Sequence, residues 1–111
     1  METQDAVKSL GALAQIHRLN VFRLLVRQGP KGLPAGEIAD QLELPASSLS
    51  FHLSQLENAG LILSWRVRRH IFYALDLEGT RQLLSFLTQD CCQGDPAICG
   101  ALVGAPLLCN E

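Results

Sequence analysis

Two short helical patterns separated by only three residues constrain the fold of this chain more than any other feature. Residues 35–42 place apolar side chains on one helical face, and residues 46–58 repeat leucine at positions 49, 53 and 56. The connection ends in Pro45, whose fixed φ suits the first position of a helix. Two short helices joined this tightly, the second polar on its outer face, form the helix-turn-helix pattern.

Two further helices are predicted before this pair. Apolar residues recur at helical spacing over residues 7–14 and again over residues 19–26. We expect the second of these helices to end at Gly29 and Pro30, because glycine favours helix termination and proline cannot continue a helix. Residues 31–34 are then predicted to form a loop.

A basic hairpin is predicted after the paired helices. Residues 61–67 and 70–75 are rich in aliphatic and aromatic side chains, as strands are, and residues 67–69 form the turn between them. Residues 61–75 contain three arginines and no acidic residue. A hairpin with Arg66, Arg68 and Arg69 near its tip is typical of a wing that contacts DNA phosphates.

A last helix is expected after Asp76, a residue that often begins helices. It contains Leu83, Leu84, Phe86 and Leu87, and Gly94 and Pro96 should break it. The predicted fold is mostly α with a small β-hairpin (α+β), a winged helix-turn-helix. We place a DNA-binding and dimerisation domain at residues 1–92 and a cysteine-containing tail at residues 93–111.

Size and composition limit the remaining classes of protein. A chain of 111 residues forms one compact domain, and 48% hydrophobic with 18% charged residues excludes a disordered or fibrous protein. No apolar run reaches the roughly 18 residues needed to cross a bilayer. The first ten residues lack the basic start and apolar block of a secretory signal, so a cytoplasmic location without membrane partners is expected.

The outer face of residues 46–58 carries side chains suited to double-stranded DNA. Hydroxyls fit close to phosphates and base edges, the amide of Gln55 can pair with adenine, and Phe51 can lie against a thymine methyl group. Alternatively, Phe51 and His52 pack on a neighbouring element. The predicted contacts on this helix are Ser47, Ser48, Phe51, His52 and Gln55.

All four cysteines lie in the last 21 residues. Cytosolic thiols stay reduced, so Cys91, Cys92 and Cys99 are predicted to bind a thiophilic ion such as trivalent arsenic, antimony, cadmium or lead. Cys109 is interpreted as a bystander. The alternatives are a pair of buried small side chains, a zinc site, and a redox switch that closes a disulfide.

The chain resembles the arsenic-responsive branch of the ArsR family over roughly residues 5–99. The resemblance rests on residues 36–63, GEIADQLELPASSLSFHLSQLENAGLIL, on the basic hairpin, and on the segment FLTQDCC that ends at Cys92. It departs from one type of arsenic sensor, because residues 31–60 contain no cysteine. The resemblance implies a homodimer in which the first and last helices form the interface, with Leu10, Leu13, Leu84 and Leu87 facing the second subunit.

Together, the patterns and the resemblance predict a repressor that binds operator DNA as a dimer and is released when As(III) or Sb(III) binds three cysteines. No organic cofactor is expected. A repressor that responds to cadmium, lead or zinc, or to thiol oxidation, is the alternative. An enzyme is not expected, since Cys91 and Cys92 stand beside Asp90 at a predicted helix end, where the field disfavours a reactive thiolate.

Overall fold

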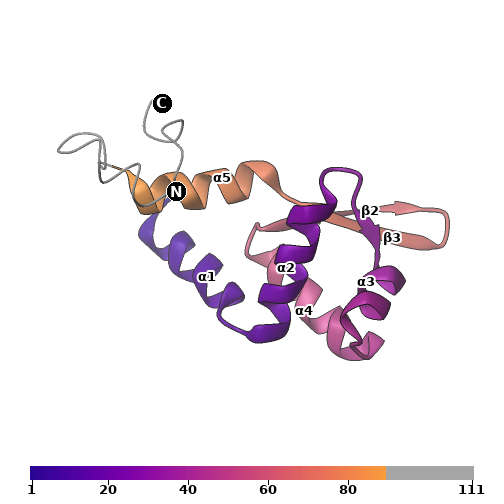
Figure 1. Ribbon diagram of the computed structural model, residues 1–111. Coiled ribbons are helices and arrows are strands. Elements are labelled where there is room, and N and C mark those ends of the chain that lie inside the picture. Colours follow the sequence, from indigo (N-terminus) through magenta and orange to yellow (C-terminus); the bar gives the residue numbers. More distant parts are fainter. Residues whose placement is uncertain (90–111) are drawn as a thin grey trace.

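The computed structural model describes residues 1–89, which form five helices and a three-stranded antiparallel sheet (Figure 1). All four cysteines and the predicted domain boundary at residue 92 lie outside these residues. The elements in chain order are α1 (Thr3–Leu13), α2 (Ile16–Gln28), β1 (Leu33–Pro34), α3 (Ala35–Leu42), α4 (Ala46–Asn58), β2 (Ile62–Val67), β3 (His70–Leu75) and α5 (Leu77–Thr88).

The core lies between α2, α3, α4 and the inner ends of the strands. Each helix contributes one apolar face, as its periodicity predicts, and the leucines of α4 are almost fully buried. Burial of these aliphatic side chains is the main source of stability in a fold of this size. The most deeply buried are Val21, Leu25, Ile38, Leu49, Leu53, Leu56, Leu61 and Ile62.

The sheet contains one strand that the sequence pattern did not predict. β1 pairs with β3, with Leu33 opposite Tyr73, in a segment predicted to be a loop. Two residues are too few to show a strand periodicity, which explains the error. Gly32, just before β1, has φ of 70°, and a Cβ there would lie 2.6 Å from the Tyr73 carbonyl oxygen. Only glycine lets the backbone approach β3 this closely.

α4 has the predicted bounds, whereas the role of Pro45 and the end of α5 differ from the prediction. Pro45 precedes α4 as its N-cap and not as its first residue, because its ψ of 144° is extended. α5 begins as predicted, with the Asp76 carboxylate accepting a hydrogen bond of 3.0 Å from the Gly79 amide. It ends at Thr88, well before Gly94, because the backbone of Gln89 is extended, with ψ of 147°.

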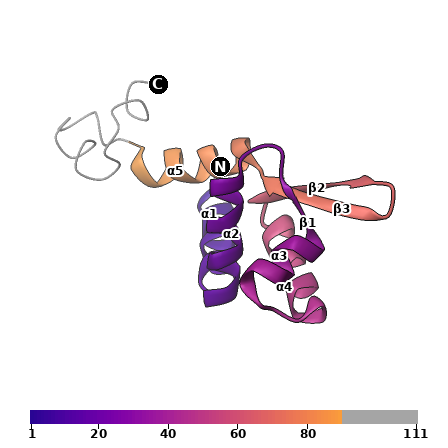
Figure 2. The ribbon, with the colours of Figure 1, turned by 45° about the vertical axis from the view of Figure 1, so that its right-hand side comes forward.

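The first two helices lie side by side, while α5 and the β2–β3 hairpin extend to opposite sides (Figure 2). α1 turns its small residues, Ala6, Ser9 and Ala12, toward the core. Its larger apolar residues, Val7 and Leu10, are exposed. No helix among residues 1–89 is long and apolar enough to span a membrane.

Candidate nucleic-acid interface

The outer face of α4 presents the side chains predicted to contact DNA. The three leucines turn inward, which leaves Ser47, Ser48, Phe51 and Ser54 exposed and Gln55 half-buried. The Phe51 ring is 59% exposed, a large fraction for an aromatic side chain on an otherwise polar face. This face therefore combines hydroxyl groups, one amide and one aromatic ring, the mixture that can contact both phosphates and base edges.

The first turn of α4 leaves backbone donors available to an anion. Its N-cap is Pro45, and no side chain caps the helix there. The turn before it is tight: Glu43 is left-handed with φ of 54°, and the Leu44 amide donates to the Ala39 carbonyl at 3.0 Å. Uncapped amides at a helix N-terminus attract phosphate oxygens. Ser47 and Ser48 are exposed beside these amides, where they can add hydroxyl contacts.

His52 does not share the exposed face of α4. Its side chain is only 9% exposed, and Nδ1 lies 3.4 Å from a terminal nitrogen of Arg18 in α2. Its ring is also 5.6 Å from the His17 ring. Burial, together with the charges of Arg18 and His17, lowers the pKa of His52 below its ordinary value of 6.5. The structure therefore gives His52 the packing position that was the alternative to a DNA contact.

The spacing of His52 carried a signal for this burial. His52 follows Leu49 by three residues and precedes Leu56 by four, and such spacings put side chains on the same side of a helix. Arg18, its partner, is 34 residues away, and no local pattern predicts a contact over that separation.

The three arginines predicted for the wing are all exposed on the β2–β3 hairpin, which projects beyond α3 and α4 (Figure 1). Val67 pairs with His70, so Arg68 and Arg69 form the two-residue turn. Arg68 has φ of 58°, a left-handed conformation that disfavours most side chains. The Nε of Arg66 donates a hydrogen bond of 3.0 Å to the Arg68 carbonyl, which holds the Arg66 side chain beside the turn.

The hairpin is held to the helices by its inner half. The Trp65 and Phe72 rings stack across the strands at 5.9 Å, and the Ser64 hydroxyl donates to the Glu57 carboxylate of α4 at 2.7 Å. The ring stack lies within the hairpin, and the hydrogen bond from Ser64 to Glu57 ties the hairpin to α4. One edge of the molecule therefore combines a polar helix face with a basic hairpin, as duplex recognition requires.

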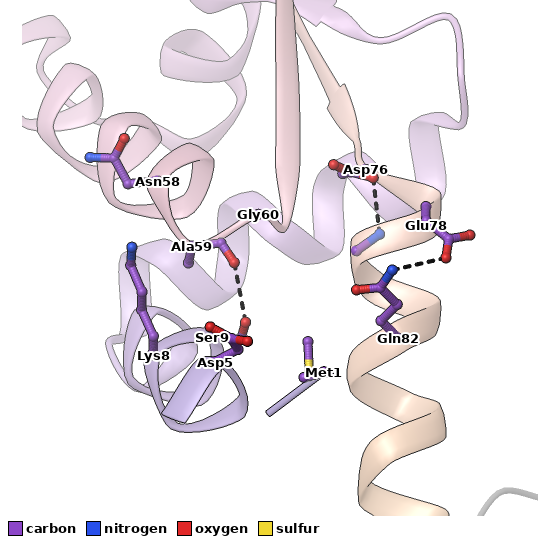
Figure 3. A pocket seen from close by; sticks show the side chains of 11 residues that line it. Met1, Asp5, Lys8, Ser9, Asn58, Ala59, Gly60, Asp76, Glu78 and Gln82 are labelled. Atoms are coloured by element: carbon purple, nitrogen blue, oxygen red, sulfur yellow. Dashed lines mark hydrogen bonds between the residues drawn. The ribbon is translucent and has the colours of Figure 1, made fainter. Parts of the chain in front are cut away.

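A polar cavity of about 360 Å³ lies where α1, the end of α4 and the start of α5 meet (Figure 3). Its lining includes Lys8, Asn58, Asp76 and Glu78, with charges of both signs. Hydrogen bonds from Arg81 and Gln82 hold the pKa of Glu78 below its ordinary value. Two of the lining residues are joined to each other: the Ser9 hydroxyl donates a hydrogen bond of 3.2 Å to the Ala59 carbonyl.

The predicted metalloid ligands Cys91, Cys92 and Cys99 lie outside the described residues, and their arrangement remains a prediction. Within residues 1–89, no three His, Cys, Asp or Glu side chains come together in a way that could hold a metal ion. Of the predicted site residues in that part of the chain, those on the outer face of α4 and on the wing are accessible at the surface, except His52.

Comparison with known proteins identifies a helix-turn-helix domain in this chain. Residues 13–64 match a family described as a helix-turn-helix domain. The transcriptional activator HlyU of Vibrio cholerae is 31% identical over 90 residues, which cover 81% of each chain. The structure of reduced HlyU superimposes with a TM-score of 0.60 at 30% identity, covering 79% of this chain and 93% of that one.

Two other proteins are similar. The transcriptional regulator YgaV of Escherichia coli is 30% identical over 80% of this chain and 88% of its own. The winged helix-turn-helix domain Mb0332 of Mycobacterium bovis, described as homodimeric and possibly of the ArsR family, superimposes with a TM-score of 0.64 at 24% identity, covering 77% of this chain and 76% of that one. The chain belongs to the family of winged helix-turn-helix transcriptional regulators that contains HlyU.

Proposed function

We propose that this chain is a dimeric repressor that leaves its operator when As(III) or Sb(III) binds Cys91, Cys92 and Cys99. The observation that carries the proposal is the place of these cysteines in the sequence. Cys91 follows Thr88, the last residue of α5, by three residues. The outer face of α5 carries exposed leucines, so a ligand bound just beyond this helix would act close to a subunit interface.

The exposed apolar side chains of α1 and α5 support the dimer. Leu10 and Leu84 are each 43% exposed, and Leu87 is half exposed. α1 and α5 contact one another, so the two faces are close enough to bury against one partner. A second copy of the chain fits this chemistry, because symmetric dimers pair apolar patches with themselves. The homodimeric Mb0332 shows that this fold can assemble in pairs.

The donor set fits a trivalent metalloid. Three thiolates are soft ligands, and soft ligands select thiophilic ions over magnesium or calcium. Arsenite, As(OH)₃, reacts with three thiols to give three As–S bonds and three molecules of water, so no oxidant or reductant is needed. A bound ion releases DNA only if it favours the state with low DNA affinity, and such coupling is typically about 5–150-fold.

The test begins with an operator selected by the wild-type chain from a library of randomised duplexes. Its dissociation constant is then measured by fluorescence anisotropy during an arsenite titration. We expect the affinity for the operator to fall by about 5–150-fold when arsenite is added. The variants Cys91→Ser, Cys92→Ser and Cys99→Ser should each abolish this response to arsenite. Cys109→Ser is the matched control and should respond as the wild type does. Unchanged operator affinity in excess arsenite would overturn the proposal.

A thiol redox switch is the second candidate. The observation that favours it is the relative HlyU, for which a structure of the reduced protein exists. Under this alternative, an oxidant such as diamide releases the operator, arsenite at equal concentration does not, and dithiothreitol restores binding. The same anisotropy assay separates the two candidates.

A further inference from the structure

Two buried polar ties join the first two helices to α4. The first is the hydrogen bond from Ser9 in α1 to the carbonyl of Ala59, the residue that caps the end of α4 (Figure 3). Ser9 is only 2% exposed, in a helix whose other buried residues are alanines. A buried hydroxyl without a partner is unfavourable, so its placement against one carbonyl fixes where α4 ends relative to α1.

The second tie passes through Arg18. Its Nε donates at 2.8 Å to the carbonyl of Ala12, in the last turn of α1, and its terminal nitrogen reaches His52 in the middle of α4. The start of α2 is fixed as well, because the Arg18 amide donates to the Gln15 side chain at 2.9 Å. One guanidinium therefore connects the corner between α1 and α2 with the inner face of α4.

This second tie extends to the DNA-facing side of α4. The His52 ring meets the ring of Phe51 edge-on at 5.9 Å, and Phe51 is the exposed aromatic residue of the outer face. The position of His52 therefore affects both the rotation of α4 about its axis and the placement of the Phe51 ring. Leucine packing alone would restrict the rotation of α4 and the placement of the Phe51 ring less, because aliphatic contacts are not directional.

We propose that Ser9, Arg18 and His52 are positioning residues that hold the recognition helix at a fixed place relative to α1. The inference rests on the proposed dimer with α1 at its interface. In that dimer, the place of α4 relative to α1 sets the distance between the two recognition helices. The half-site spacing of the operator follows from that distance. Tightly held helices accept one spacing, whereas loosely held helices accept several.

The experiment measures two quantities with the full chain, using the operator selected by the wild type. The first is the dissociation constant. The second is the discrimination ratio. It is the dissociation constant for an operator with one base pair inserted at its centre, divided by the dissociation constant for the native operator. The variants Ser9→Ala, Arg18→Met and His52→Leu each remove a tie. His52→Asn keeps an acceptor near the place of Nδ1, and Ser85→Ala on α5 lies outside both ties.

We expect Arg18→Met and His52→Leu each to weaken operator binding about fivefold to tenfold, because each removes the contact between Arg18 and His52. Both should also lower the discrimination ratio. The double variant should bind no worse than either single one, because both changes remove the same tie. The dissociation constant of His52→Asn should stay within about twofold of the wild-type value, and that of Ser85→Ala should equal the wild-type value. Ser9→Ala should add to Arg18→Met, since the two ties are separate.

Unfolding in urea and far-ultraviolet circular dichroism identify the variants that are folded under the assay conditions. The proposal is overturned if folded Arg18→Met and His52→Leu keep the wild-type discrimination ratio, even if their affinities fall. It is also overturned if His52→Asn loses as much discrimination as His52→Leu. A wild-type chain that binds the operator as a monomer would instead refute the dimer of the proposed function, which sedimentation of the complex would reveal.

Discussion

α4 and α1 have similar lengths but distribute their side chains in opposite ways. α4 buries its leucines and exposes serines, whereas α1 buries Ala6, Ser9 and Ala12 and exposes Val7 and Leu10. In α4 the apolar face is fully used within one subunit. In α1 the larger apolar side chains remain uncovered, although the helix still packs on α2 and α4.

The difference is the one expected if the two helices face different partners, as proposed. A polar outer face with one exposed aromatic ring suits the wet, charged surface of DNA. An apolar outer face in water is stabilised only when another apolar surface covers it. In the proposed dimer, α1 is an interface helix that packs on the core through small residues, and α4 is a core helix that carries a binding surface. Each of the following predictions tests this contrast.

The largest effect is expected from the inner face of α4. Leu53→Ala should lower the free energy of unfolding by about 2–5 kcal/mol, because it leaves a cavity in the core. Val7→Ala on α1 should lower it by less, about 1 kcal/mol or below, since Val7 is mostly exposed within one subunit and would be covered only by the partner in the proposed dimer. Urea denaturation at a single protein concentration compares the two. Equal losses would mean that α1 contributes its large residues to the same core.

The next effect concerns association. Leu84→Glu on α5 should shift the chain from dimer to monomer without unfolding it, because a charge in an apolar interface is left without a partner. Leu63→Glu on β2 is the matched control, since Leu63 is 41% exposed and belongs to the hairpin and not to α1 or α5. Sedimentation velocity measures both. A dimer that persists in Leu84→Glu, or dissociates equally in the control, would contradict the assignment of α5 to the interface.

A smaller effect is expected at the tip of the wing. Arg68→Asn removes one charge from each subunit, so the slope of log affinity against log salt for the proposed dimer should fall by about two units. The same change should leave the unfolding free energy unchanged or raise it by about 1 kcal/mol, because asparagine tolerates a positive φ. Arg68→Lys keeps the charge and should keep the slope. If both variants keep it, Arg68 does not contact phosphate.

The sequence predicted the parts of this fold that repeat. The leucines of α4 and the aliphatic and aromatic residues of the hairpin define their elements locally, so the boundaries of α4, β2 and β3 were predicted to within one residue. β1 was missed because its two residues pair with a strand 40 positions away in the chain. The exposure of Leu10 follows from tertiary packing, since periodicity finds an apolar face without saying what covers it.

The candidate site was predictable to a similar degree. The outer residues of α4 and the wing arginines are exposed as expected. The ties made by Ser9 and Arg18 were not foreseen, because each joins residues far apart in sequence, 50 positions for Ser9 and Ala59. A small buried serine in an alanine face is the one local sign of such a tie.

The smallest effect should appear in the pH dependence of stability, where the inner face of α4 again differs from exposed surface. The folded pKa of His52 lies below its unfolded value of 6.5, so the unfolded chain binds more protons as the pH falls through 6.5. The unfolding free energy should therefore decrease below pH 6.5 and be flat, for this group, above it. His52→Asn should remove this decrease, whereas His70→Asn on the exposed wing should retain it. Urea unfolding between pH 5.5 and 7.5, on the order of one pH unit either side of the unfolded pKa, measures the slope. If the wild type and His52→Asn show the same slope, the histidine beside Arg18 is not held in its neutral form by the packing of α4.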